Sequence, residues 1–349
     1  MKTSVVILNW NGKSLMEEYL PNVISNTLFE TEKNVEIIIA DNGSKDGSLE
    51  FLKTNYSDKI KCIDLTQNHG FAEGYNLALA QIDSKYAVLL NSDVKVTQGW
   101  LDILIDFMES NPDVAACQPK IRSLRQEAYF EHAGASGGFI DYLGYPFCRG
   151  RVLSFVEKDD GQYDTPIDLF WATGACLCVR MDEFRNVGGF DARFFAHMEE
   201  IDLCWRLRSR GKRIVCVPQS CVFHLGGATL NKENPRKTFL NYRNNLLMLY
   251  KNAPGKTFRK IFIIRLFLDY LSVFVFLLSG KFGDAKAAVR ARYYFWKMRP
   301  DFKSQRLENL RKTKNSSIPE MYRGSMIFDY YFRGKRYFSD FFPETKSEH

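Results

Sequence analysis

Residues 87–94 read AVLLNSDV, a run of large aliphatic residues that stops at three small polar ones. Similar apolar runs precede it in the chain, at residues 5–8 (VVIL), 35–40 (VEIIIA) and 61–65 (KCIDL). All are short, rich in β-branched residues and without polar alternation, which is typical of strands covered by helices on both faces. Residues 73–82 and 100–112 show helical spacing of apolar positions. The pattern predicts an α/β fold with a Rossmann-like, mostly parallel sheet and helices on both faces.

Polar residues follow each of these strands, where doubly wound sheets bind their ligands. They are Asn9, Asp41, Asn68, Asn91 and Asp93. The sequence contains neither a GxGxxG fingerprint nor a GxxxxGKS/T loop, so the pocket holds its ligand in another way. A carboxylate on such a loop suits a hard divalent ion that shares its shell with phosphate oxygens. We therefore expect Asp93 to hold Mg²⁺ or Mn²⁺ against a diphosphate, and capping of the next turn is the alternative.

The 349 residues, 45% of them hydrophobic, can bury a substantial core. The eight cysteines form no CxxC pair and sit mostly in apolar runs, so we expect reduced core residues of a cytosolic protein and no disulfide or zinc framework. The first twelve residues have no long apolar segment, and we expect no secretory signal peptide there.

The last third of the chain changes character. Residues 261–280 (IFIIRLFLDYLSVFVFLLSG) are the most hydrophobic stretch and match a bilayer span in length, but Arg265 and Asp269 interrupt it. Eleven Lys or Arg and three Asp or Glu follow in residues 281–314. We expect a catalytic domain at 1–230 and a helical, basic region at 231–349 that lies on the inner face of the cell membrane, peripherally. A spanning helix and a soluble, packed helix are the alternatives.

Eight short motifs occur in order between residues 3 and 230: VVILNWNG, IIIADNGSKDGS, NHGFAEGYN, LLNSDV, WATGACLCVR, VGGFDARFF, HMEEIDLCWRLRSRGKRI and VFHLGG. Together they resemble the family 2 glycosyltransferases, especially the rhamnosyltransferase branch. The resemblance implies a GT-A fold, a nucleotide-sugar donor, a divalent metal (Mg²⁺ or Mn²⁺) and inversion at the anomeric carbon.

The resemblance also implies roles for single residues. Asp41 matches the acidic residue that pairs with the nucleobase, and Asn9 matches its neighbour on the first strand. Asp93 matches the last residue of the DXD metal motif, in which Asn91 stands where the first Asp would be. His224 matches a histidine that completes the metal shell, although a histidine hydrogen-bonded at a strand end would look the same.

Attack by a sugar hydroxyl requires a carboxylate that accepts the proton as the bond forms. Glu200 aligns with the second acid of the family's ED motif, the usual base, and it lies in a first helical turn from which it can face the pocket. Glu199 is the other candidate, and the helix dipole would also explain an acid there. Asp202 and Arg206 are four residues apart and are expected to form a structural ion pair.

Further residues match segments around the substrates. Trp171 and Gly174 border the donor and acceptor sugars in the family, but a buried structural tryptophan is an equal alternative for Trp171. Asn68, Gly70 and Asn76 surround a predicted helix start, where backbone N–H groups can meet phosphate or sugar oxygens.

The sequence thus predicts transfer of a sugar, with rhamnose favoured by resemblance, from a UDP- or dTDP-linked donor to a saccharide or polyprenyl-linked acceptor in cell-surface polysaccharide synthesis. A sugar-nucleotide pyrophosphorylase is an alternative, but NWNGKSLMEEYL is not the Gly-rich basic loop that it needs. A noncatalytic nucleic-acid-binding protein is the other alternative, suggested by a sequence pI of about 8.8 and by 14% aromatic residues. It would carry basic residues at the strand ends, where this chain has Asp41 and Asp93.

Overall fold

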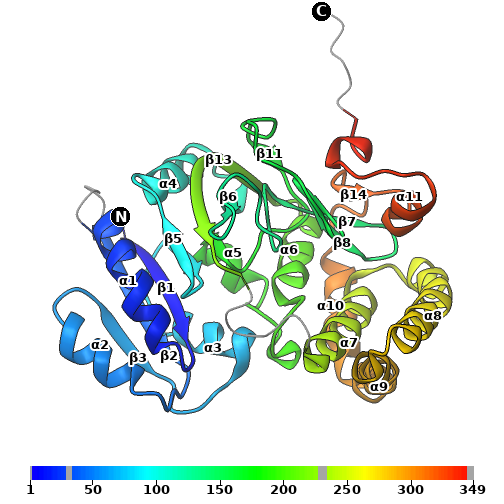
Figure 1. Cartoon of the computed structure of the whole chain (residues 1–349), viewed down its shortest axis with the longest axis horizontal. Coiled ribbons are helices and arrows are strands. Elements are labelled where there is room, and N and C mark those ends of the chain that lie inside the picture. The colour runs from blue at the N-terminus through cyan, green and yellow to red at the C-terminus, as the bar shows by residue number, and fades with distance from the viewer. Residues whose placement is uncertain (1, 29–33, 227–233, 344–349) are drawn as a thin grey trace, which may run out of the picture.

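The computed structural model describes residues 2–28, 34–226 and 234–343. Its centre is a nine-stranded sheet in which the first four strands run parallel in the order β3-β2-β1-β4 (Figure 1). These strands are β1 (Lys2–Asn9), β2 (Asn34–Asp41), β3 (Lys61–Asp64) and β4 (Tyr86–Leu90). The register pairs Asn9 with Asp41, so the polar residues of two neighbouring strand ends lie side by side.

The other half of the sheet is mixed. β12 (Cys176–Arg180) runs antiparallel between β4 and β6 (Val114–Ser123), and β13 (Arg213–His224) runs parallel to β6. β5 (Val94–Val96) and β11 (Ile167–Asp168) pair with β13. The runs RIVCVP and SCVFH, which look like two strands, form the single β13 with a register shift between Val217 and Cys221. Pro218 in this gap has no N–H to give to the ladder, which accounts for the interruption.

Helices cover both faces of the sheet, as predicted. They are α1 (Lys13–Leu28), α2 (Ser48–Tyr56), α3 (Gly70–Leu79), α4 (Trp100–Ser110), α5 (Met181–Asn186) and α6 (Glu199–Ser209), with a short 3-10 helix η1 (Ala192–Phe194) before α6. Alternate residues of β1 enter different hydrophobic clusters, Val6 on one face and Val5 and Ile7 on the other. The lack of polar alternation in these strands therefore reflects burial on both sides. All eight cysteines are free thiols, buried or half-buried.

The Gly-rich stretch 134–150 has no strong periodicity, so its sequence predicts a long loop. That prediction is wrong, because the stretch contains part of a second, five-stranded sheet. Its order is β10-β9-β8-β7-β14, from β7 (Gly138–Asp141), β8 (Pro146–Cys148), β9 (Arg151–Val152), β10 (Phe155–Val156) and β14 (Met321–Tyr322). The strands are very short, and all four residues of β7 are buried. Neither length nor alternation was available to reveal them in the sequence.

The C-terminal part is helical, as predicted (Figure 1). It contains α7 (Pro235–Asn252), α8 (Gly255–Leu278), α9 (Phe282–Met298), α10 (Lys303–Lys312) and α11 (Met326–Phe332), with 3-10 helices η2 (Arg299–Phe302) and η3 (Phe338–Asp340). Leu246, Phe295 and Phe338 belong to the same hydrophobic cluster as Val6 of the central sheet, so the two parts share one core. The boundary expected at residues 230/231 lies outside the described residues.

Candidate active site

Asp93 and His224 meet at one end of the central sheet, although 131 residues separate them in the chain. Asp93 follows β4 and His224 ends β13, and β5 pairs with β13 so that Val94 lies opposite His224. The Nε2 atom of His224 lies 3.1 Å from Oδ1 of Asp93, and the Nδ2 atom of Asn91 lies 3.4 Å from the same nitrogen. Both Asp93 and His224 are buried. The structure therefore brings together the three residues of the expected metal site.

Glu131 stands behind His224, and sequence reasoning missed it. Its Oε2 lies 3.5 Å from Nδ1 of His224, and its side chain is also buried. Burial opposes a charged imidazole, but the hydrogen bonds and charges of Asp93 and Glu131 outweigh burial and raise the pKa of His224 to about 10. Burial would raise the pKa of Glu131, but His224 reverses the direction and lowers it. No spacing in the sequence marks Glu131, because it lies in an irregular segment far from both partners.

The donor set fits a divalent cation. If two ligand atoms each lie about 2.1 Å from an ion and are at right angles to each other, they are about 3 Å apart. The distance between Oδ1 of Asp93 and Nε2 of His224 is 3.1 Å, which agrees with this value. Glu131 on the second ring nitrogen is the partner that orients metal-binding histidines. Among the described residues, no group of three His, Cys, Asp or Glu side chains is arranged to hold a metal. A cation here would therefore complete its shell with substrate oxygens and water.

Asn9 and Asp41 form a second polar pair, at the ends of β1 and β2. The Nδ2 atom of Asn9 donates to Oδ2 of Asp41 at 3.0 Å, and the backbone N–H of Ser44 donates to Oδ1 of Asp41 at 2.9 Å. Both side chains are buried, and the Oδ1 atom of Asn9 has no hydrogen-bond partner among the described residues. An unpaired acceptor beside a fixed carboxylate is suited to a ligand that donates hydrogen bonds, such as a nucleobase edge.

Glu199 and Glu200 open helix α6. Glu199 is buried and Glu200 is half-buried, and the Oε2 atom of each lacks a hydrogen-bond partner within the described part of the chain. Burial raises the pKa of Glu200 to about 7, with the N–H groups of the first helical turn acting against it. Burial, together with the charges of Glu200 and Asp202, raises the pKa of Glu199 well above its ordinary value. Burial therefore favours the neutral form of both carboxyl groups, and Glu200 titrates near neutral pH.

Asp202 has the structural role that its spacing predicted. Its Oδ2 accepts from Nε of Arg206 at 2.9 Å and from Nζ of Lys251 at 2.8 Å, and its side chain is fully buried. Lys251 also donates to Asp191 at 2.8 Å. This cluster attaches α6 to α7 and is not open to a substrate.

The segment before α6 lies against the start of α3. The backbone O of Phe195 accepts from the N–H groups of Phe71 and Ala72 at 2.7 and 3.2 Å. A Cβ atom on Gly70 would come within 2.6 Å of the Phe195 ring, so this close approach requires glycine. Oδ1 of Asn68 accepts from the N–H of Gly70 at 2.8 Å. Asn68 and Gly70 thus place the predicted donor-binding helix start beside the segment that carries Glu199 and Glu200.

Trp171 is a buried structural residue in this structure. Its indole N–H donates to the backbone O of Phe139 at 2.9 Å, its side chain is 5% exposed, and its ring packs on Gly138. The backbone at Gly174 lies against Phe71, where a Cβ would be 2.9 Å from the ring. Their contact with substrate remains a prediction.

Asn76 is occupied by local contacts. Its side-chain amide donates to the backbone O of Phe190 at 2.9 Å and accepts from the N–H of the same residue at 3.0 Å. It therefore fixes the segment that leads into η1, and a role in substrate binding stays a prediction.

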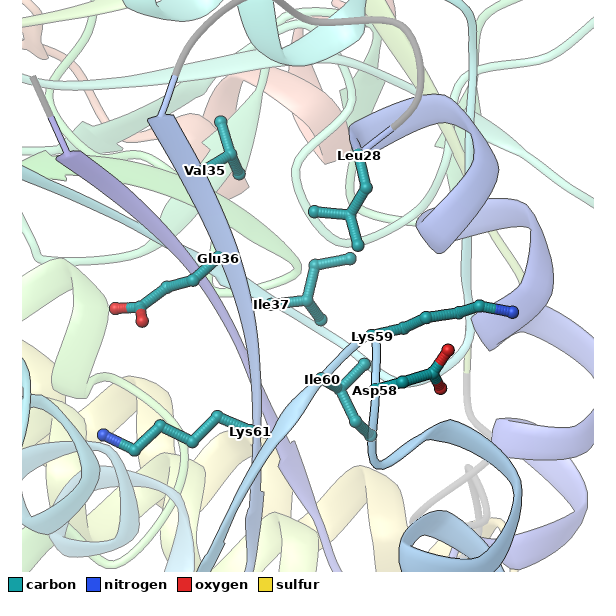
Figure 2. A pocket seen from close by; sticks show the side chains of 8 residues that line it. All are labelled: Leu28, Val35, Glu36, Ile37, Asp58, Lys59, Ile60 and Lys61. Carbon is teal, nitrogen blue, oxygen red and sulfur yellow. The ribbon is translucent and has the colours of Figure 1, made fainter.

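A cavity of about 530 Å³ lies elsewhere, near the opposite ends of β2 and β3 (Figure 2). Its lining includes Val35 and Ile37 at the start of β2 and Lys61 at the start of β3. Asp41 and the other polar strand ends are at the other edge of the sheet. This cavity is therefore separate from the candidate site.

Comparison with solved structures identifies the fold. The chain is similar to the structure described as GalNAc-T7 with UDP, GalNAc and Mn²⁺, with a TM-score of 0.57 at 16% identity. The similarity covers 73% of this chain and 48% of that one, so the chain spans about half of that structure's length. This likeness shows a GT-A glycosyltransferase fold, as the sequence resemblance implied.

Residues 4–165 match the family described as Glycosyl transferase family 2. This segment is slightly less than half of the chain, and its similarity to the family supports a role in glycosyl transfer.

Two curated relatives are similar over most of their own length. One is the N-acetylglucosaminyl-diphospho-decaprenol L-rhamnosyltransferase of Mycobacterium tuberculosis (strain ATCC 25618 / H37Rv), 28% identical over 252 residues, which cover 68% of this chain and 81% of the relative. The other is the rhamnosyltransferase WbbL of Escherichia coli (strain K12), 26% identical over 221 residues, which cover 60% of this chain and 79% of the relative. The chain is therefore similar to two curated rhamnosyltransferases.

Proposed function

We propose that this chain is an inverting, metal-dependent glycosyltransferase that moves rhamnose, or a related sugar, from a UDP- or dTDP-linked donor to a polyprenyl-diphosphate-linked saccharide. The observation that carries the proposal is the pair of Asp93 and His224, with Glu131 behind the histidine. Glu200 adds an acid whose pKa is raised to about 7 and whose Oε2 has no hydrogen-bond partner among the described residues. The names of the relatives support the choice of sugar and acceptor.

Glu200 is the proposed base. A sugar hydroxyl loses its proton far above neutral pH, so it becomes a nucleophile when a nearby carboxylate takes the proton as the new bond forms. A carboxyl with a pKa of about 7 matches that task better than one with the ordinary value of 4.5. Attack on the face opposite the diphosphate, in one displacement, inverts the anomeric carbon. Glu199 is assigned a supporting role because its pKa is raised much further.

Asp93 and His224 are the proposed metal ligands. A divalent cation held by them would offset the charge that develops on the departing diphosphate. Asn91 contributes no charge to this site, so Asp93 is its main negative group. Glu131 holds the imidazole ring in place through Nδ1.

Asp41 and Asn9 are the proposed contacts to the nucleobase. Their fixed, buried positions and the unpaired Oδ1 of Asn9 support this assignment. Such contacts hold the donor equally in the ground state and in the transition state, so they act on affinity and not on turnover.

We also propose that residues 231–349 hold the catalytic part, residues 1–230, on a membrane surface through α8. Within the described residues, α8 is long and apolar enough to cross a membrane, yet only 17% of its most apolar window is buried. Its exposed side chains are apolar, with Phe267 71% and Leu278 74% exposed. The buried residues of α8 include Arg265 and Asp269. A helix that buries the two charged residues of its apolar stretch and exposes the apolar side chains around them needs an apolar surface outside the protein.

The contacts of Arg265 and Asp269 favour a helix lying on the membrane over one crossing it. Arg265 donates to Asp269 at 3.1 Å and to the backbone O of Leu143 at 3.0 Å, and Asp269 also pairs with Arg292 of α9. A spanning α8 would carry these partners into the bilayer or leave the two charges unpaired in it, at a cost of several kcal/mol. The exposed Lys286, on the adjoining helix α9, suits anionic lipid.

The activity is tested by incubating the purified full chain with a panel of UDP- and dTDP-sugars and a short-chain polyprenyl-diphosphate-linked N-acetylglucosamine acceptor. We expect transfer from one donor, with Mg²⁺ or Mn²⁺ present. Turnover of no donor in the panel, or full turnover in excess chelator, would contradict the proposal.

Membrane attachment is tested by flotation with vesicles that contain anionic phospholipid. We expect the wild type to float and Phe267→Glu combined with Leu278→Glu to remain in solution. Tyr129→Glu is the matched control, since Tyr129 is 40% exposed but lies outside α8. Equal flotation of all three proteins would show that α8 is not the contact.

A further inference from the structure

The segment from Arg193 to Met198, here called the base loop, leads into Glu199 and Glu200 and has an unusual backbone. Phe195, His197 and Met198 have positive φ angles of 66°, 70° and 73°. Residues other than glycine rarely adopt this backbone conformation, which costs on the order of 1–3 kcal/mol per residue. The base loop has three such residues within four positions, so its backbone keeps this strained conformation only if surrounding groups hold it in place.

The carbonyl groups of the base loop show which groups hold it. Asn244 of α7 is completely buried, and its Nδ2 lies 2.9 Å from the backbone O of Phe194, 2.9 Å from that of Ala196 and 2.8 Å from that of His197. The preceding residue, Arg243, reaches the carbonyls of Arg193 and Phe194 at 3.3 and 3.1 Å.

The remaining contacts of the base loop come from α3 and α6. The carbonyl of Phe195 accepts from the start of α3, and the carbonyl of Met198 accepts from the N–H of Asp202 at 2.9 Å. Every carbonyl from Arg193 to Met198 thus has a donor, and α7 supplies donors for four of the six. Since every carbonyl of the base loop has a donor, loss of the donors from α7 would leave some of these carbonyls unpaired in a buried place.

We propose that Asn244 is a positioning residue for the catalytic base: its amide holds the base loop in the strained form that directs Glu200 toward the acceptor hydroxyl. This inference rests on the proposed function. It gives the C-terminal region a part in catalysis, because a contact from α7 sets the geometry of a site whose other residues all precede residue 225.

Arg243 makes a selective substitution possible. Its Nε donates to Oδ1 of Asn244 at 2.8 Å. Asn244→Asp keeps the shape of the side chain and this hydrogen bond, but removes both N–H donors to the base loop. Asn309→Ala is the matched control, because Asn309 is also a buried amide and donates to Asn252 at 3.1 Å, away from the base loop.

The test measures kcat, the KM for the donor sugar nucleotide, and hydrogen–deuterium exchange of peptides covering residues 193–202. For Asn244→Asp we expect kcat to fall at least 30-fold, donor KM to change less than about threefold, and exchange to rise selectively in these peptides. Asn309→Ala should lower the melting temperature without either effect. If Asn244→Asp does not fold, Asn244→Ser, which keeps one donor, takes its place with a smaller loss of kcat expected.

A folded Asn244 variant with wild-type kcat, or with unchanged exchange in the base loop, would overturn the inference. A wild type that turns over no donor would instead overturn the proposed function, and the exchange experiment would still decide whether Asn244 holds the loop.

Discussion

Replacing Glu200 by Gln should abolish transfer and at the same time stabilise the protein at alkaline pH. The folded state raises the pKa of Glu200 from 4.5 to about 7, mainly through burial. The folded protein therefore binds this proton more tightly than the unfolded chain, and stability is lost as pH rises from about 4.5 through about 7. A difference of about 2.5 units corresponds to about 3 kcal/mol, and we expect roughly 1–2 kcal/mol because the half-buried carboxylate is partly screened by water.

The measurement is thermal unfolding of wild type and Glu200→Gln at pH 5 and pH 8, together with initial rates of transfer. We expect a variant that melts about 2–5 °C higher than wild type at pH 8, no such gain at pH 5, and transfer reduced by more than 100-fold. The wild-type kcat/KM should rise with pH with a midpoint near 7.

Glu199→Gln is the control for this substitution. Since burial favours the neutral form of Glu199, an amide there resembles that form. We expect Glu199→Gln to keep much more activity than Glu200→Gln. A variant Glu200→Gln that is less stable than wild type at pH 8, or a greater loss of activity in Glu199→Gln, would refute the assignment of the base.

Other substitutions separate the remaining roles. Asp93→Ala should abolish donor turnover at any Mn²⁺ concentration tested, whereas Glu131→Gln should raise the Mn²⁺ concentration needed by about 10–100-fold with activity regained at saturation. An unchanged Mn²⁺ titration of Glu131→Gln would show that Glu131 does not act through His224. Asp41→Ala should weaken UDP or dTDP binding in calorimetry at least tenfold and lower kcat less than threefold. Unchanged nucleotide affinity would exclude the base-edge contact.

The central sheet could be predicted because its strands carry their own signal. The aliphatic run that stops before Asn91 predicts a strand and forms β4 (Tyr86–Leu90), since burial on both faces leaves an unbroken apolar run. The small second sheet had no such signal, because its strands of two to four residues are shorter than any periodicity. Its pairing of β7 with β14 also joins segments about 180 residues apart.

The site residues divide in the same way. Asp41 and Asp93 are visible in the sequence because each follows an apolar strand directly. The contact of His224 with Glu131 is not, because it arises from the pairing of β13 with β6 and from the irregular segment after β6. Trp171 had two equal interpretations. The bond from its indole N–H to the backbone O of Phe139 could not be predicted from the sequence, and contact with substrate stays a prediction.

The sequence also did not show that Arg265 and Asp269 of α8 point into the protein. Their buried contacts decide which variants can separate the functions of the C-terminal region. Arg265 lies 4.1 Å from the centre of the Tyr145 ring and pairs with Asn245, next to Asn244, and with Asp269. A chain cut near residue 255 would lose this support under α7 together with the apolar face, so loss of membrane binding and loss of the base loop would occur together. Substitutions of Phe267 and Leu278 leave these buried contacts in place. If membrane attachment and catalysis are separate functions of this region, such variants should leave the membrane and still transfer sugar to a soluble acceptor.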